Sequence, residues 1–128
     1  RQVSSAASDV YKRQIMDAML GSLALGDIGQ LFPDTDSRFK GADSAELTRE
    51  VRRLCLVEGY SVSNLDLTIL CEEPKVGPVR DVMRQCIADV LETPPDQISV
   101  KATTTERLGS LGRGEGIAVM ASVLMRAH

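Results

Sequence analysis

Three stretches of the chain place apolar residues at the three- and four-residue spacing of a buried helix face. Gly26 and Gly59 follow two of these stretches, and a Thr-Pro-Pro run at 93–95 follows the third. Glycine tolerates the left-handed turn beyond a helix, whereas proline removes a backbone N–H that a helix interior needs. Asp43 or Ser44 can cap the middle helix. The spacing therefore predicts helices over residues 15–25, 44–58 and 79–91.

Three other stretches carry the two-residue period of a strand. The segment NLDLTIL within 62–71 alternates apolar and polar residues, which is typical of a half-buried strand. Residues 98–102 predict a short strand, and residues 116–125 carry apolar side chains on both faces. We expect this last strand to be buried on both sides, with either another subunit or a helix over its second face.

These elements predict a single α+β domain with helices packed on a sheet. A length of 128 residues and a hydrophobic fraction of 43% suffice to bury one core. The formal net charge of −3 and the lack of a basic run argue against duplex nucleic acid as a partner. No apolar segment approaches the roughly 20 residues of a membrane helix, so no membrane is expected either. The three cysteines lack the spacing of a disulfide framework or zinc site, which favours a reducing cytoplasm.

Carboxylates gather in the loop predicted between the first two helices. Asp27, Asp34 and Asp36 lie in DIGQLFPDTD, within a stretch rich in glycine, proline and aspartate. Their oxygens could accept hydrogen bonds from sugar hydroxyls or hold a hard cation. Turn formation and solubility explain the same residues equally well.

Two further segments follow predicted strands and carry groups suited to phosphate. Lys75 in EEPKVGP stands where a lysine and exposed amides suit an anion, although an ordinary exposed lysine is the commoner explanation. The segment Thr103 to Glu106 supplies three hydroxyls and a carboxylate. A carboxylate beside phosphates implies a bridging divalent cation, because the like charges otherwise repel. Strand propensity alone also explains the threonines.

Two segments, ALGDIGQLFPDTDSRFKGADS and KATTTERLGSLGRGEGIA, together resemble the 2-C-methyl-D-erythritol 2,4-cyclodiphosphate synthase family of non-mevalonate isoprenoid (terpenoid) biosynthesis. The likeness runs from about Ile15 to the end of the chain. It implies an α+β subunit with helices on one face of a mainly four-stranded sheet, assembled as a homotrimer with active sites between subunits. It also implies a phosphorus-oxygen lyase that cyclises 4-diphosphocytidyl-2-C-methyl-D-erythritol 2-phosphate and releases CMP, in the bacterial cytoplasm or in a plastid of a plant or alga.

The resemblance assigns roles to residues at matching positions. Thr104 would stabilise the transition state, and Glu106 would hold magnesium or manganese together with the substrate phosphates. Asp27 to Gly29 would contact the ribose, and the FPDTD loop would cover the erythritol phosphate. Cys71 to Gly77 would form the cytidine-binding turn, and Thr103 to Glu106 would bind the diphosphate. The implied substrate-binding residues are Asp27, Ile28, Gly29, Phe32, Pro33, Asp34, Thr35, Asp36, Cys71, Pro74, Lys75, Val76, Gly77, Thr103, Thr104, Thr105, Glu106 and Arg113.

The family's zinc site is where this chain departs from the resemblance. Aligned without gaps from Asp17, the family's last zinc-binding histidine falls on Arg13, and a guanidinium has no lone pair to give a metal. Residues 1–14 are therefore predicted to be a disordered or foreign leader. Residues 15–128 would form one synthase domain, truncated or chimeric at its start, without the family's N-terminal strands or its zinc ligands. A catalytically inactive cytidine-nucleotide-binding or structural homologue is the alternative.

Overall fold

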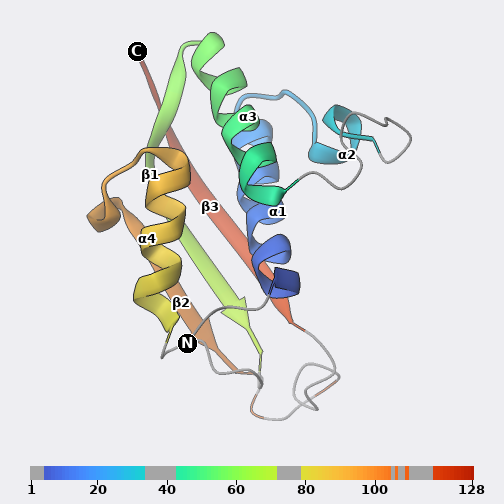
Figure 1. Cartoon of the computed structure of the whole chain (residues 1–128), viewed down its shortest axis with the longest axis vertical. Coiled ribbons are helices and arrows are strands. Elements are labelled where there is room, and N and C mark those ends of the chain that lie inside the picture. Colours follow the sequence, from blue (N-terminus) through green and yellow to red (C-terminus); the bar gives the residue numbers. More distant parts are fainter. Residues whose placement is uncertain (1–4, 34–42, 72–78, 105, 107–108, 110–116) are drawn as a thin grey trace.

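A computed structural model describes residues 5–33, 43–71, 79–104, 106, 109 and 117–128 (Figure 1). Helices and strands follow one another along the chain, as the hydrophobic pattern predicts. The elements are α1 (Ser5–Ser22), α2 (Ile28–Leu31), α3 (Ser44–Val57), β1 (Tyr60–Leu70), α4 (Arg80–Leu91), the 3-10 helix η2 (Pro95–Gln97), β2 (Ile98–Thr103) and β3 (Ala118–Ala127).

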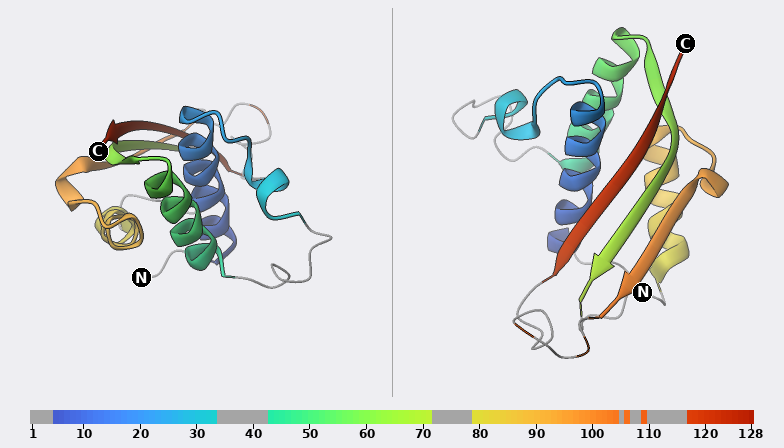
Figure 2. Two further views of the ribbon diagram at one scale, coloured as in Figure 1. Left: turned by 90° about the horizontal axis from the view of Figure 1, so that it is seen from above. Right: turned by 180° about the vertical axis from the view of Figure 1, so that it is seen from behind.

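The described strands form one mixed sheet with β1 in the centre. The order is β2-β1-β3, in which β1 pairs with β2 in parallel and with β3 antiparallel. Parallel neighbours need a crossover connection, and α4 lies within the crossover from β1 to β2. Figure 2 shows α1, α3 and α4 together on one face of the sheet. The α+β class is confirmed. The sheet has three strands among the described residues, so the predicted fourth strand stays a prediction.

The core lies between this sheet and its helices. Leu65, Leu67 and Ile69 of β1 point to the same side and are at most 4% exposed. Val51 of α3 and Met19 of α1 have no exposed surface. The period-two pattern of β1 thus packs against the helical stripes, as expected for a sheet covered on one face. No helix in the described part of the chain is long and apolar enough to cross a membrane.

The first helix begins much earlier than the sequence pattern predicts. It starts at Ser5 instead of Ile15 and ends at Ser22 instead of Leu25, so residues 5–14 are helical and not disordered as predicted. Tyr11 explains the extension, because it lies one helical turn before Ile15 on the same face and is only 3% exposed. A foreign origin for the segment stays a prediction.

Strand β3 packs one face against the core and leaves its other face open in the single chain, so the cover expected from another subunit stays a prediction. Its residues Val119, Ala121, Val123 and Met125 pack against the core. The alternate face is open, with Met120 58% and Leu124 57% exposed. All the long helices occupy the opposite side of the sheet, so no helix among the described residues covers this face (Figure 2).

Replacing Tyr11 with alanine tests whether the start of α1 belongs to the core. We expect the Tyr11→Ala variant to lose about 3 kcal/mol of unfolding free energy, the usual cost of deleting a buried aromatic ring. Urea unfolding followed by circular dichroism measures this loss. Asp9→Ala is the matched control, because Asp9 is exposed on the same helix. Equal stability of the two variants would mean that residues before Ile15 add nothing to the fold.

Candidate functional site

The C-terminal ends of β1 and β2 lie side by side at one end of the sheet. Leu70 is paired with Thr103, and the backbone N–H of Cys71 donates to the carbonyl oxygen of Thr103, with 3.1 Å between nitrogen and oxygen. On its other side Leu70 pairs with Ala118, where β3 begins. The segments predicted to hold cytidine and diphosphate therefore start from adjacent backbones, at the edge where open sheets with parallel strands commonly bind ligands.

The turn after β2 presents oxygen atoms to solvent. Thr104 Oγ1 accepts a hydrogen bond from the backbone N–H of Glu106 at 3.1 Å, and Thr103, Thr104 and Glu106 are all exposed. Glu106 has a φ of +55°, in the left-handed region that non-glycine residues seldom adopt. Two hydroxyls and a carboxylate are thus displayed together. Such a carboxylate suits magnesium or manganese when phosphates supply further oxygen ligands.

The predicted ribose segment forms a short helix beside α1. Asp27 is the N-cap of α2, and its Oδ1 accepts from the backbone N–H of Gln30 at 2.9 Å. The backbone N–H of Ile28 donates to Oδ1 of Asp17 on α1, at 2.8 Å. Gly29 is exposed, and the turn into the helix passes through Gly26 at a φ of +94°.

Asp17 is a residue to which the sequence pattern assigned no functional role. Its one available signal is an acidic residue inside an otherwise apolar helical stripe, next to the buried Met16. A half-buried carboxylate needs a hydrogen-bond partner, so such a residue is worth noting. The partner itself, Ile28 in another helix, could not be read from spacing.

The structure separates two groups of predicted site residues within one chain. Asp27, Ile28 and Gly29, followed by the half-buried Phe32 and Pro33, lie by the C-terminal end of α1. Cys71, Thr103, Thr104 and Glu106 lie where β1 and β2 end, at the other end of the sheet (Figures 1 and 2). The remaining predicted residues fall outside the described part of the chain, namely Asp34, Thr35, Asp36, Pro74, Lys75, Val76, Gly77, Thr105 and Arg113.

The position aligned with the family's zinc ligand does not suit a metal. Arg13 is exposed on α1, and a guanidinium offers no lone pair. Within the ranges that the structure describes, no group of three or more histidine, cysteine, aspartate or glutamate side chains is placed to hold a metal ion. The described residues therefore do not fit zinc.

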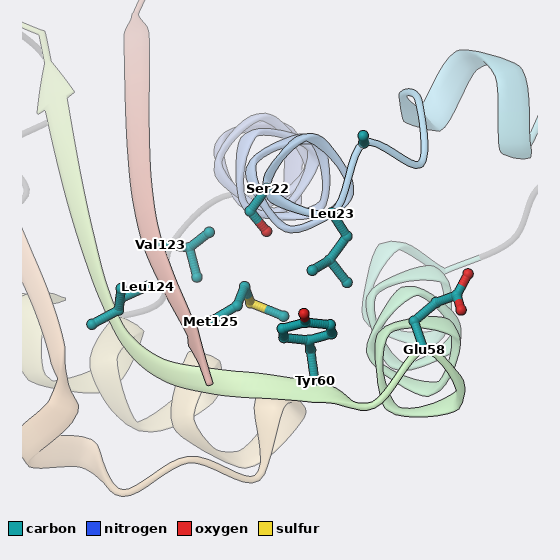
Figure 3. A pocket seen from close by; sticks show the side chains of 8 residues that line it. Ser22, Leu23, Glu58, Tyr60, Val123, Leu124 and Met125 are labelled. Atoms are coloured by element: carbon teal, nitrogen blue, oxygen red, sulfur yellow. The ribbon is translucent and has the colours of Figure 1, made fainter. Parts of the chain in front are cut away.

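A hollow of about 660 Å³ lies apart from the predicted site residues. It opens between the C-terminal ends of α1, α3 and β3 and the start of β1 (Figure 3). Its lining combines apolar and polar surface and includes none of the substrate-binding residues named above. The lining residues are Ser22, Leu23, Ala24, Glu58, Tyr60, Val123, Leu124 and Met125.

A charged pair crosses the open face of the sheet near the strand ends. Lys101 Nζ lies 2.8 Å from Oδ2 of Asp66, and the two side chains are 60% and 42% exposed. The hydrogen bond from Lys101 lowers the pKa of Asp66 below its usual value, and this outweighs a smaller opposing effect of burial. Lys101 and Thr103 lie on the same face of β2, which brings the lysine charge near the predicted diphosphate segment. That charge is already paired with Asp66.

Comparison with known proteins identifies the family. The sequence model of the YgbB family matches residues 2–126, and the chain therefore belongs to the YgbB family. The match begins well before Ile15, where the resemblance was expected to begin.

Two relatives named 2-C-methyl-D-erythritol 2,4-cyclodiphosphate synthase illustrate the match. The relative from Acinetobacter baylyi is 56% identical over 117 residues, which cover 91% of this chain and 72% of the relative. The relative from Geobacter sulfurreducens is 55% identical over 118 residues, covering 92% and 75%.

Solved structures share the fold. The IspF from Plasmodium falciparum, determined as a CDP complex, has a TM-score of 0.82 at 32% identity, covering 92% of this chain and 70% of that one. The bifunctional IspDF from Campylobacter jejuni has a TM-score of 0.88 at 40% identity, and this chain spans 32% of its length.

The Asp66–Lys101 pair makes a testable contribution to stability. Because the folded-state pKa of Asp66 is lowered, the pair stabilises above the ordinary pKa of about 4 and loses its effect as the pH falls through the folded value. Solvent screening keeps the effect below about 1 kcal/mol. We expect Lys101→Met to lower the unfolding free energy more at pH 7 than at pH 2.5, measured by urea unfolding. Lys101→Arg keeps the charge and serves as control. A loss of equal size at both pH values would contradict the ionic origin.

Proposed function

We propose that this chain is a subunit of a 2-C-methyl-D-erythritol 2,4-cyclodiphosphate synthase in isoprenoid biosynthesis. In this reaction an oxygen of the 2-phosphate of 4-diphosphocytidyl-2-C-methyl-D-erythritol 2-phosphate attacks the β-phosphorus. The bond from that phosphorus to the bridging oxygen breaks, and CMP leaves with the electron pair. The chain is thus a phosphorus-oxygen lyase.

The observation that carries the proposal is 56% identity over 117 residues to relatives of that name. The junction of Cys71 with Thr103 supports it, because this hydrogen bond joins the starts of the predicted cytidine and diphosphate segments. The inactive homologue is not favoured, since relatives at this identity bear the name of the active enzyme.

Phosphoryl transfer of this kind asks little covalent work of the protein. Its main requirements are that the reacting phosphates are brought together and that their charge is neutralised. We assign the hydroxyls of Thr103 and Thr104 to bind the diphosphate oxygens. Thr104 would in addition stabilise the transition state. Glu106 would hold a magnesium or manganese ion, which supplies charge neutralisation between the phosphates.

A homotrimer with sites between subunits accounts for two features of the chain. The first is the separation of Asp27 from Thr104, because one subunit would contribute the ribose contact and its neighbour the diphosphate contact. The second is the open face of the sheet, where Met120 and Leu124 remain exposed in the single chain. Apolar patches of this kind commonly mark subunit contacts.

The outer edge of β3 is where the predicted fourth strand would pair. Bacterial relatives favour the cytoplasm as the location.

Substitution at Glu106 tests the catalytic assignment. We expect Glu106→Gln to slow CMP release by about 100-fold with magnesium present, a loss typical of removing one charge-stabilising group. Release is followed by chromatography. Glu92→Gln is a matched control, because Glu92 is also an exposed glutamate with a positive φ, +51°, but stands at the end of α4.

The unsubstituted chain separates the functional alternatives. Binding of CDP in calorimetry without CMP release would identify the nucleotide-binding homologue. A chain that neither binds CDP nor releases CMP would be a structural subunit, and the proposal would be wrong.

Substitution on the open face tests the assembly. We expect Met120→Glu to shift the protein from trimer to monomer in sedimentation equilibrium, because a carboxylate would be buried without a partner. Val57→Glu is the control, since Val57 is 71% exposed on α3 and lies on the helical side. A trimer that survives the Met120 substitution would place the subunit contact elsewhere.

A further inference from the structure

The carboxylate of Asp17 joins two helices at the predicted ribose segment. Its Oδ1 accepts a hydrogen bond from the backbone N–H of Ile28, the first residue of α2, at 2.8 Å. An N–H group in the first turn of a helix has no partner within that helix. Asp17 therefore supplies from α1 an acceptor that α2 cannot provide for itself.

The short helix α2 depends on contacts outside itself. It contains four residues, none of them buried, which is too short for cooperative helix stability. Its own cap, Asp27, satisfies the N–H of Gln30. Ile28 and Leu31 add only partly buried apolar contact with the core. The hydrogen bond from Ile28 to Asp17 is therefore a directional link that packing alone does not replace.

The other partner in this link is fixed firmly. Asp17 lies between buried positions of α1, where Ile15, Met16, Met19 and Leu20 are at most 1% exposed. Close-packed side chains hold a helix in one place and orientation. The half-buried carboxylate of Asp17 is thus carried by a helix that packing holds in place, and its hydrogen bond sets the position of Ile28.

We propose that Asp17 is a positioning residue of the nucleotide site. By holding Ile28 it keeps Asp27 and Gly29 oriented toward the ribose of a bound cytidine nucleotide, without touching the nucleotide itself. This role rests on the proposed function. The acceptor oxygen matters more than the charge, because a neutral amide oxygen can accept the same hydrogen bond. Asparagine at this position should therefore preserve the role, and alanine should abolish it.

Two measurements on the full chain test the proposal. Hydrogen exchange by NMR reports whether the Ile28 amide is protected, and calorimetry with CDP reports affinity for the nucleotide. We expect Asp17→Ala to lose the protection and to weaken CDP binding by about tenfold, with Asp17→Asn close to the unsubstituted protein in both. Arg52→Ala is a control for general destabilisation, because it removes a hydrogen bond from Arg52 to the carbonyl of Leu91 that joins α3 and α4.

The possible outcomes decide between positioning and simple stability. Arg52→Ala should lower the melting temperature and leave CDP affinity unchanged; an equal loss of affinity would overturn the positioning role. It would also be overturned if Asp17→Ala exposed the Ile28 amide but bound CDP normally, or if Asp17→Asn failed as alanine does. If the unsubstituted chain binds no CDP, the nucleotide site is refuted together with the role of Asp17 in it. Exchange at Ile28 then still decides whether Asp17 holds α2.

Discussion

The pairing of β1 with a parallel neighbour on one side and an antiparallel neighbour on the other constrains the rest of the molecule. Parallel pairing with β2 requires the chain to cross over through α4, and the crossover returns it with Thr103 beside Leu70. Antiparallel pairing with β3 places the start of that strand at the same end of the sheet, where Ala118 lies opposite Leu70. Every segment that leaves this edge is therefore anchored to a buried central strand. The apolar alternation of β1 thus determines where the hydroxyls after β2 emerge.

The three long helices that the structure describes lie on one side of the sheet, which gives the described part of the molecule two chemically different faces. The covered side holds the core, with Leu67 and Val51 fully buried. The other side carries Met120 and Leu124 together with the Asp66–Lys101 pair. A charged pair among apolar side chains does little for the stability of a single chain.

The elements were predictable where the chain obeys one periodicity, as in β1 and in the stripes of α3 and α4. The start of α1 was missed because its Ser- and Ala-rich beginning carries little apolar signal, and Tyr11 acts through tertiary packing. The apolar pattern of β3 could not tell which of its faces the helices cover, and burial of the second face by another subunit stays a prediction. The threonines at 103–105 could be named from the sequence, but the adjacency of Thr103 to Cys71 depends on strand register. The link from Asp17 to Ile28 depends on the path of the turn between two helices.

The left-handed backbone at Glu106 places two selective pressures in opposition at a single position. A glycine there would relieve the steric cost of a φ of +55° and would let the chain fold more readily. It would also remove the carboxylate. Variants selected only for stability should therefore accumulate glycine at this position, and variants selected for turnover should retain the acid. A glutamate retained at position 106 despite this backbone cost therefore indicates selection for the carboxylate.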